Sequence, residues 1–309
     1  MVEGDIKSYK AEFTPLVLGR HRLEVSVNDQ PVKGSPFEIV VTIPPTQLGK
    51  PVKVFSGVKQ PIDIAINSRG EIVIAENHGG IVVLDKSGKK LRSVEKSHYG
   101  FKKPQGIAVD KDDNIYMTDN DNKSLFKFSS WCQLVEIAGS SFGHTQLSSF
   151  HPWGVTVMDE QVIVLGSRDP SVLFVFTRKL ELVKRISLEG DGLGVTCDIS
   201  THKLYVSDYR NGDIRVLSLE DEGKALPMRL FSSNKLTHPH SVCVARKLLY
   251  VSDWGKHSVC VFSSEGTFVT SFGRKGMEVG QFSCPSGLAF DDDGFLYVCD
   301  LNSSLVQVF

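Results

Sequence analysis

A strand pattern that recurs along the chain constrains the fold more than any other feature of the sequence. Residues 104–128 read PQGIAVDKDDNIYMTDNDNKSLFKF, and residues 284–309 read CPSGLAFDDDGFLYVCDLNSSLVQVF. Each copy has a proline, a small residue two positions on, an alternating apolar run, an acidic turn, a second apolar run that ends in aspartate, and a third run. The pattern can be traced six times over residues 49–309, at about 43 residues per copy, and this period predicts an all-β six-bladed β-propeller.

Two landmarks locate the copies: a proline near the start and an acidic residue at the end of the second strand. The prolines are Pro61, Pro104, Pro152, Pro239 and Pro285, and the acidic residues are Glu76, Asp119, Asp208, Asp253 and Asp300. The fourth copy starts without proline at Gly192, and the third has Gly166 or Ser167 in the acidic position. Because the acidic residues recur at one place in the repeat, we interpret them as loop caps that bond backbone N–H groups, not as metal ligands or catalytic acids.

Each copy is expected to form four antiparallel strands, but the last copy ends after its third strand. The strand-like residues 52–55 precede the first of the prolines and belong to no copy. We predict that they supply the missing strand and close the ring, because closure removes the open sheet edges that promote aggregation. Small residues on the first strands, such as Gly106 and Gly287, fit a crowded central channel.

The segment before the repeats has three strand-like runs, residues 6–13, 21–27 and 37–43, separated by turn-forming residues. Its motifs YKAEFTP, GRH and GSPFEIV resemble the closing half of a filamin-type immunoglobulin repeat. The resemblance implies a partial sandwich over residues 1–43 that has lost most of its partner strands, so we expect either the cut end of a longer protein or a poorly packed appendage. The following PPT predicts a stiff, extended linker over residues 44–48, which leaves residues 49–309 for the propeller.

Composition narrows the functional classes. Of the 309 residues, 41% are hydrophobic and 23% are charged, which suits a globular chain with a substantial core. The net charge of −1 provides no overall attraction for nucleic acid or anionic membranes, so such a partner requires a local basic patch. The sequence shows no apolar run of transmembrane length, no signal peptide and no CxxC pair among its six cysteines. We therefore expect a cytoplasmic protein with reduced thiols, no membrane partner, no bound metal and no cofactor.

The repeat motifs Pro-x-Gly-(Ile/Leu)-Ala-(Val/Phe)-Asp, (Leu/Ile)-Tyr-(Val/Met)-x-Asp and Asn-x-x-(Leu/Ile)-x-(Val/Lys)-Phe resemble NHL repeats over residues 49–309. A filamin-type repeat followed by six NHL blades resembles the C-terminal half of TRIM-NHL proteins. The resemblance implies a target-recognition module in a ubiquitin-ligase or post-transcriptional setting, whose full-length relatives carry a RING and oligomerise through a coiled coil. Neither zinc-ligand spacing nor heptads occur here, so ubiquitin transfer is implied by the family alone.

The candidate binding surface is the face on which the loop before the first strand and the loop between the second and third strands open together. Basic, amide and aromatic residues interleave in these loops. The candidates are Lys102, Lys103, Asn120, Lys123, His151, Trp153, Arg168, Tyr209, Arg210, Asn211, His238, His240, Trp254, Lys256 and His257. Such a mixture suits hairpin or single-stranded RNA, because aromatic rings stack on bases while Lys and Arg meet phosphates. Family members also bind proteins through this face, so the expected partner is RNA or a protein target.

Two other interpretations stay open. The tryptophans, Trp153 above all, could plug between blades. Related six-bladed propellers include lyases and hydrolases with a metal at the channel mouth, and His78, His151, His238, His240 and His257 could approach one another there. These histidines come from non-equivalent copies, and no carboxylate is singled out from the repeated ones. We therefore expect no catalytic residues and a non-enzymatic module.

Overall fold

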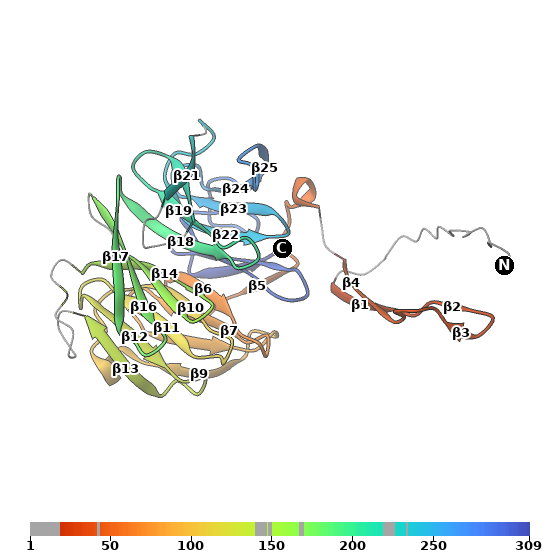
Figure 1. Cartoon of the computed structure of the whole chain (residues 1–309), viewed down its shortest axis with the longest axis horizontal. Coiled ribbons are helices and arrows are strands. Elements are labelled where there is room, and N and C mark those ends of the chain that lie inside the picture. Colours follow the sequence, from red (N-terminus) through yellow and green to blue (C-terminus); the bar gives the residue numbers. More distant parts are fainter. Residues whose placement is uncertain are drawn as a thin grey trace, which may run out of the picture.

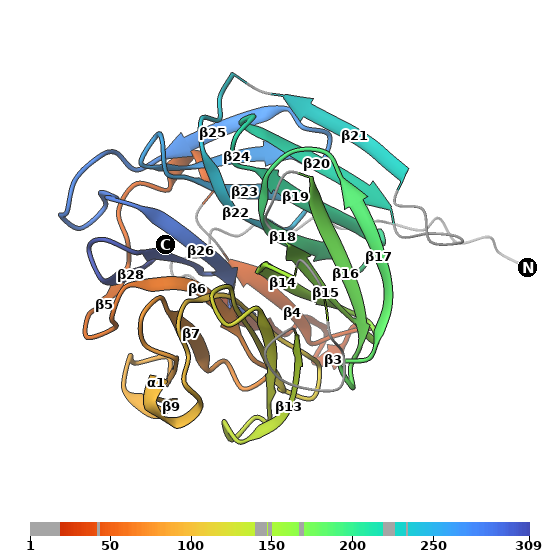
Figure 2. The same ribbon diagram turned by 90° about the vertical axis from the view of Figure 1, so that its left-hand side faces the viewer.

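The computed structural model describes residues 19–41, 44–139, 147, 150–166, 170–218, 226–232 and 234–309, without the side chains of residues 46 and 226–232. The predicted strand over residues 6–13 and the candidate Arg168 lie outside the described residues. The described part of the chain forms six four-stranded antiparallel sheets and two small two-stranded ribbons near the N-terminus. Figures 1 and 2 show the six sheets around a common axis, with the ribbons projecting to one side.

The first five sheets each follow the sequence order, with the inner strand first. The first three blades are β6 (Pro61–Ile66), β7 (Ile72–Glu76), β8 (Ile81–Leu84) and β9 (Lys90–Val94); β10 (Pro104–Val109), β11 (Ile115–Asp119), β12 (Ser124–Phe128) and β13 (Leu134–Gly139); and β14 (Pro152–Met158), β15 (Gln161–Gly166), β16 (Ser171–Thr177) and β17 (Leu182–Leu188). The next two are β18 (Gly192–Asp198), β19 (Lys203–Asp208), β20 (Asp213–Ser218) and β21 (Leu226–Ser232); and β22 (Pro239–Ala245), β23 (Leu248–Asp253), β24 (Ser258–Ser263) and β25 (Phe268–Phe272). A short helix, α1 (Lys96–Tyr99), joins the first blade to the second.

The sixth blade is completed by a strand from the other end of the propeller. It contains β26 (Pro285–Phe290), β27 (Leu296–Asp300) and β28 (Leu305–Val308), followed by β5 (Lys53–Phe55) in the order of the sheet. Val306 pairs with Phe55 and Val308 pairs with Lys53 in an antiparallel register. The predicted closure by residues 52–55 is therefore confirmed, and the inner strands contact their neighbours around a closed ring.

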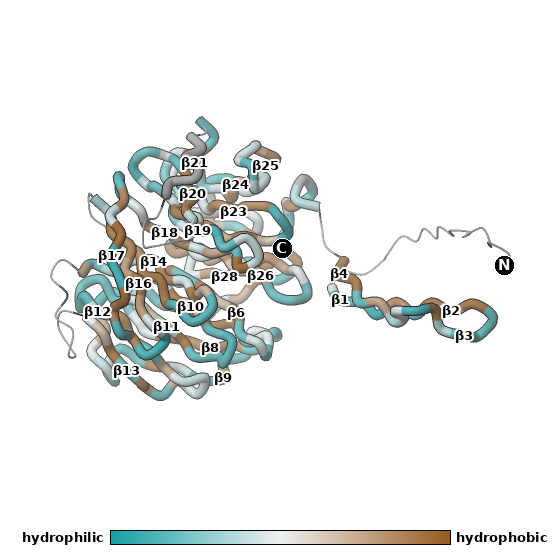
Figure 3. Tube along the Cα trace, viewed as in Figure 1, coloured by the Kyte–Doolittle hydropathy of each residue, from teal (hydrophilic) through white to brown (hydrophobic). Residues whose placement is uncertain are grey.

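The hydrophobic core lies between neighbouring blades. The second strands are buried on both faces, and every residue of β7 and of β11 is buried. One cluster joins Val73 and Val83 of the first blade to Phe101, Phe126 and Phe128 of the second. Each buried phenylalanine contributes about 1.5–3 kcal/mol, so these clusters hold the blades side by side. Figure 3 shows the resulting contrast between hydrophobic strands and hydrophilic turns.

Glycines on the inner strands let adjacent blades meet near the axis. A Cβ atom on Gly106 would lie 2.5 Å from the carbonyl oxygen of Trp153. A Cβ atom on Gly287 would lie 2.5 Å from Cα of Asp63. Both contacts are with backbone atoms, which cannot move away as a flexible side chain could. The prediction that small residues mark a crowded channel is confirmed at these positions.

The N-terminal ribbons pair β1 (Gly19–Leu23) with β4 (Phe37–Val41) and β2 (Ser26–Val27) with β3 (Gln30–Pro31). The predicted strand over residues 21–27 is thus split in two. Apolar side chains of these ribbons are not covered by other described residues. Val27 is 61% exposed, Phe37 is 39% exposed and Val40 is 40% exposed. A second sheet packed against these ribbons is absent from the part of the chain described, and the filamin-like sandwich stays a prediction, as do the domain boundaries.

The prediction of an extended linker was wrong at its centre. Residues Pro45–Gln47 form a 3₁₀ turn, η1, in which Gln47 N donates to Pro44 O at 2.8 Å. Proline at the first helical position has its φ already fixed at a helical value and lacks only an N–H that would be unpaired there. Leu48 then packs against the core between the fifth and sixth blades, so the segment is held against the propeller.

Candidate binding face and central channel

The acidic residue that ends the second strand in most blades holds two loops together. Asp119 accepts hydrogen bonds from the backbone N–H groups of Lys102 at 2.7 Å, Lys103 at 3.0 Å and Asn122 at 3.0 Å. Its side chain is fully buried. The loop before the inner strand and the loop after the second strand therefore lie on the same face, which confirms their predicted placement and the loop-cap interpretation.

The same bonding recurs in other blades. Glu76 accepts from Lys59 N, Asp208 from Asn211 N, Asp253 from Thr237 N, His238 N and Lys256 N, and Asp300 from Ser283 N and Cys284 N. We call the surface made by these loops the loop face. The opposite surface, made by the tight turns between first and second and between third and fourth strands, is the turn face.

An aromatic cluster crosses the loop face from the fourth blade to the fifth. The ring centroid of Tyr209 lies 4.9 Å from that of His238 and 5.9 Å from that of Trp254, which it meets edge-on. Trp254 also stacks on His240 with a centroid separation of 4.2 Å and an interplanar angle of 14°. Four predicted residues are thus brought together into one contiguous group.

The structure moves His240 from the predicted binding face to the wall of the central channel. Sequence position placed it among the surface candidates, but it is 5% exposed and lies beneath the Trp254 ring. It follows Pro239 as the second residue of β22, so its side chain lines the central channel instead of projecting outward. Burial lowers the pKa of His240 to about 3, which keeps the imidazole neutral.

Exposed cations lie around the aromatic cluster and across the second blade. Lys102, Lys123 and Arg210 are exposed, and Arg210 Nη2 lies 3.5 Å from a carboxylate oxygen of Asp191. Lys256 is less available, because its ammonium donates to backbone carbonyls of Asn234 and Lys235. Since the repeated acidic side chains are buried, the exposed charge of the loops is mainly positive despite the neutral composition.

Several other candidates have structural contacts. Asn120 Nδ2 donates to Pro152 O, Asn211 Nδ2 donates to Asp208, His257 Nδ1 lies 2.7 Å from Ser283 O, and Lys103 Nζ lies 5.3 Å from the centroid of Trp153. His151 is half-buried beside the second and third blades. These residues shape the loops, and the exposed sides of Tyr209 and Arg210 remain the clearest contact points for a ligand.

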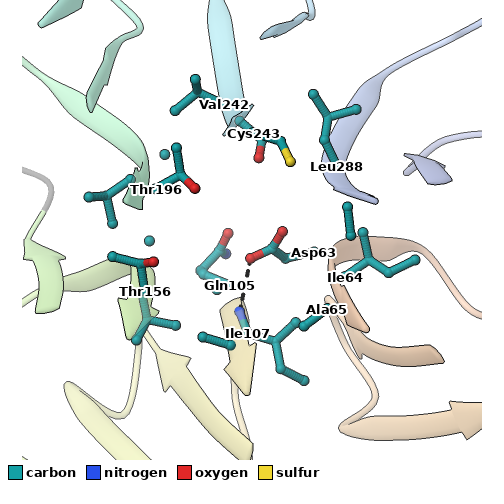
Figure 4. A pocket seen from close by; sticks show the side chains of 18 of the residues that line it. Asp63, Ile64, Ala65, Gln105, Ile107, Thr156, Thr196, Val242, Cys243 and Leu288 are labelled. Atoms are coloured by element: carbon teal, nitrogen blue, oxygen red, sulfur yellow. Dashed lines mark hydrogen bonds between the residues drawn. The ribbon is translucent and has the colours of Figure 1, made fainter. Parts of the chain in front are cut away.

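A cavity of about 250 Å³ follows the axis of the propeller and is lined by all six inner strands. Its wall contains one charged residue, Asp63, which sequence reasoning missed. Asp63 occupies the position where other blades have Gly106, Gly154, Gly194, Ser241 and Gly287, so alignment of the six copies would have revealed it. Figure 4 shows its carboxylate pointing into the space enclosed by the strands.

Polar atoms without partners gather at one end of this channel. Five buried atoms make no hydrogen bond within the described structure: Gln105 Oε1, Trp153 Nε1, Trp254 Nε1 and both ring nitrogens of His240. Gln105, Trp153 and His240 line the cavity directly. Trp153 therefore lies at the channel mouth, which differs from both the surface role and the plug between blades that its sequence position allowed.

The described residues were predicted to include histidines that could approach one another at the channel mouth. Among the described residues, no group of three or more His, Cys, Asp or Glu side chains is arranged to hold a metal ion. The histidines proposed for such a site do not meet as a set, since His238 and His240 instead contact Tyr209 and Trp254. The same part of the chain contains no helix with the length and apolarity needed to span a membrane.

Comparison with known proteins supports the repeat and the fold. The NHL repeat family matches residues 101–128 and 282–309, which include the first three strands of the second and sixth blades. No curated protein matched the chain significantly. The chain therefore contains NHL repeats, set in a six-bladed β-propeller.

Three solved structures illustrate how widely this fold is shared. A streptogramin B lyase has 13% identity and a TM-score of 0.60, over 83% of this chain and 96% of its own. A Xanthomonas campestris gluconolactonase has 15% identity and a TM-score of 0.65, over 84% and 90%. The β-propeller domain of Swd1 from Myceliophteria thermophila has 10% identity and a TM-score of 0.59, over 84% and 99%. At these identities the likeness extends to the fold alone.

Proposed function

We propose that this propeller is a non-catalytic recognition module of TRIM-NHL type that binds single-stranded RNA on its loop face. The observation that carries the proposal is the half-buried Tyr209 ring, which packs on His238 and Trp254 and is followed by the exposed Arg210. A ring held in this way offers a fixed platform for a base, and a neighbouring guanidinium can meet the adjoining phosphate.

The charge distribution supports RNA more than a neutral protein surface. Lys102 and Lys123 of the second blade extend the positive surface beyond Arg210. Because the net charge of the chain is −1, the affinity must come from these local contacts and must weaken as salt rises. A protein target with an acidic, aromatic-poor surface is the alternative that the experiment below separates.

The biological setting follows from the repeats and the N-terminal motifs. NHL repeats behind a filamin-like segment support a role as the target-binding half of a cytoplasmic TRIM-NHL protein, in ubiquitin ligation or post-transcriptional regulation. The lyase and gluconolactonase share only 13% and 15% identity with this chain, and their activities are not part of the proposal.

The proposal is tested by binding to a random-sequence single-stranded RNA pool over a salt series, measured by fluorescence anisotropy. We expect submicromolar binding at low salt. In a double variant, Lys102→Ala with Lys123→Ala, the slope of log K against log salt should shrink by about 1.4, because each phosphate contact contributes about 0.7.

The matched control replaces two exposed lysines of the turn face, Lys111→Ala with Lys179→Ala, and changes the net charge equally. RNA binding through the loop face predicts an unchanged salt slope for this control. Equal losses in the two double variants would show non-specific attraction, and an absence of binding at low salt would favour a protein target.

A further inference from the structure

The central channel has a feature that the loop-face function does not use. Six inner strands enclose a cavity of about 250 Å³, and Asp63 is the one charged side chain in its wall. Asp63 Oδ2 accepts a hydrogen bond from Ile107 N at 2.9 Å. Asp63 is half-buried, and no lysine or arginine among the described residues forms an ion pair with it, although carboxylates withdrawn from bulk water ordinarily have such a partner.

The bond to Ile107 does not by itself require a charged residue. In other blades a neutral hydroxyl links neighbouring inner strands: Thr118 Oγ1 donates to Trp153 O, Ser207 Oγ to His240 O and Ser252 Oγ to Ser286 O. The first blade has Ala75 at the equivalent position of its second strand, and Asp63 makes the link instead. An amide or hydroxyl side chain could accept the Ile107 N–H equally well, so the fold does not require a negative charge at this position.

Neutral acceptors lie beside this charge. Gln105 is 3% exposed, and its Oε1 is buried without a partner. His240 is 5% exposed, and neither of its ring nitrogens has a partner in the described residues. Figure 4 shows the Gln105 amide pointing into the same enclosed space as Asp63, with the hydroxyl-bearing Thr156 and Thr196 around it. A buried acceptor without a donor is costly, and a ligand with several N–H groups would remove that cost.

We propose that the channel binds a primary ammonium group, with Asp63 as its counter-ion and Gln105 Oε1 as a second acceptor. An ammonium has one positive charge and three donors, which matches one carboxylate surrounded by neutral acceptors. Calcium or magnesium would require several anionic oxygens, and the wall supplies one carboxylate. At about 30 Å³ for each water-sized group, the cavity holds roughly eight such groups, enough for an ammonium on a short alkyl chain.

The channel mouth already attracts an ammonium of the protein itself. Lys103 Nζ lies 5.3 Å from the ring centroid of Trp153, and that ring lines the cavity. Aromatic faces attract cations and would favour the passage of an alkylammonium toward Asp63. Two sources share this chemistry: a free amine that enters the channel, and the lysine side chain of a protein bound at the mouth.

Binding should displace a proton from Asp63. Burial raises the pKa of Asp63 to about 7, and a bound cation would lower it by favouring the carboxylate. Cys243 and Cys299 are the titratable groups that feel the charge of Asp63, and His240 lines the same cavity. Burial lowers the pKa of His240 to about 3, raises that of Cys243 to about 12 and raises that of Cys299 well above its ordinary value. None of these three groups changes charge near neutral pH.

The test is isothermal titration calorimetry of the full chain with 1,4-diaminobutane and with Nα-acetyl-lysinamide, in two buffers of different ionisation enthalpy at pH 6.5. We expect saturable binding with proton release in the wild type. Asp63→Asn keeps an acceptor for Ile107 N and should weaken binding at least tenfold, with no proton release. The matched control, Asp121→Asn, removes an exposed loop carboxylate and should bind as the wild type does.

The two amines distinguish the sources, because binding of the diamine alone indicates a free amine and binding of the lysinamide indicates a side chain. If Asp63→Asn does not fold, Gln105→Met decides, and it should weaken binding several-fold. The proposal is overturned if neither amine binds, if Asp63→Asn or the deciding Gln105→Met binds as tightly as the wild type, or if calcium chloride saturates the site while the amines do not.

Discussion

The loop face and the turn face of the propeller both contain carboxylates that accept backbone N–H bonds, but arginine partners are more frequent on the turn face. On the loop face, Asp119 and Asp253 accept hydrogen bonds from backbone N–H groups. On the turn face, Asp110 pairs with Arg178 at 2.7 Å and Glu71 pairs with Arg92. Lys102 and Lys123 of the loop face are exposed, whereas Arg178 and Arg92 of the turn face are paired with carboxylates within the protein.

The largest effect is expected from removal of a loop-face cap. Asp119→Ala leaves three backbone N–H groups without their acceptor. Each unpaired group costs about 1–3 kcal/mol, and because two of the three bonds are part-buried we take the low end and expect a loss of about 3 kcal/mol in the free energy of unfolding. Urea denaturation measures this loss. Asp121→Ala in the same loop should change stability by less than about 0.5 kcal/mol, and equal losses in both variants would contradict the cap assignment.

On the turn face, Arg178→Ala should cost about 1–3 kcal/mol, because it removes the partner of the buried Asp110 while bonds from Asn114 and Tyr116 to that carboxylate remain. Burial opposes the ionised form of Asp110, but hydrogen bonds from Asn114 and then from Arg178 lower its pKa. Because the Arg178 contribution is an ion pair, the loss should be smaller at high salt than at low salt. Thermal melting in 0.05 and 1 M salt checks this difference. A salt-independent loss would mean that Arg178 acts through packing.

Two aromatic residues sharpen the comparison of the faces in RNA binding. Tyr209→Ala on the loop face should weaken RNA binding roughly 5- to 150-fold, the effect of one lost base stack. Trp131 on the turn face is 72% exposed and lies 5.6 Å from Arg92 and 6.0 Å from Arg69, a superficially similar aromatic and basic group. Trp131→Ala should change the affinity less than about twofold, because its arginines are already paired with carboxylates. The reverse ranking would move the binding site to the turn face.

A pH dependence of opposite sign is expected for two carboxylates. The pKa of Asp63 is raised from 3.8 to about 7, so its contribution to stability is present below about pH 4 and is lost as pH rises toward 7. The pKa of Glu71 is lowered from 4.5 to about 2, mainly by Arg92, so its contribution is lost as pH falls below about 4.5. Asp63→Asn should abolish the decline between about pH 4 and 7 in a melting series and leave the acidic decline intact. An unchanged profile would show that Asp63 does not titrate in this range.

The repeat explains why much of the fold could be read from the sequence. An acidic residue that recurs at one blade position has one structural reason, so Asp119 and Asp253 identified the caps without coordinates. The unpaired third strand of the last copy likewise pointed to residues 52–55. By contrast, a residue after the inner-strand proline can project outward or into the channel, and the spacing alone placed His240 on the wrong side.

Asp63 was missed for a different reason. A repeat is recognised by what its copies share, and attention to the shared glycine hides the two copies that depart from it, which have Asp63 and Ser241. The N-terminal segment is a third case. Its motifs resemble a filamin-type repeat, but its described strands form two small ribbons without the opposing sheet that would test the predicted sandwich. Functional residues of a repeat protein are therefore to be sought among its exceptions.

The closing strand also determines how the propeller responds to mechanical load. Lys53 at the start of β5 pairs with Val308, next to the C-terminal Phe309, so the chain enters and leaves the ring at the same end of one strand pair. Tension between these two points opens the pair one residue at a time instead of shearing it as a whole. Because three residue pairs hold that seam, we expect such tension to detach β5 while β26, β27 and β28 stay paired.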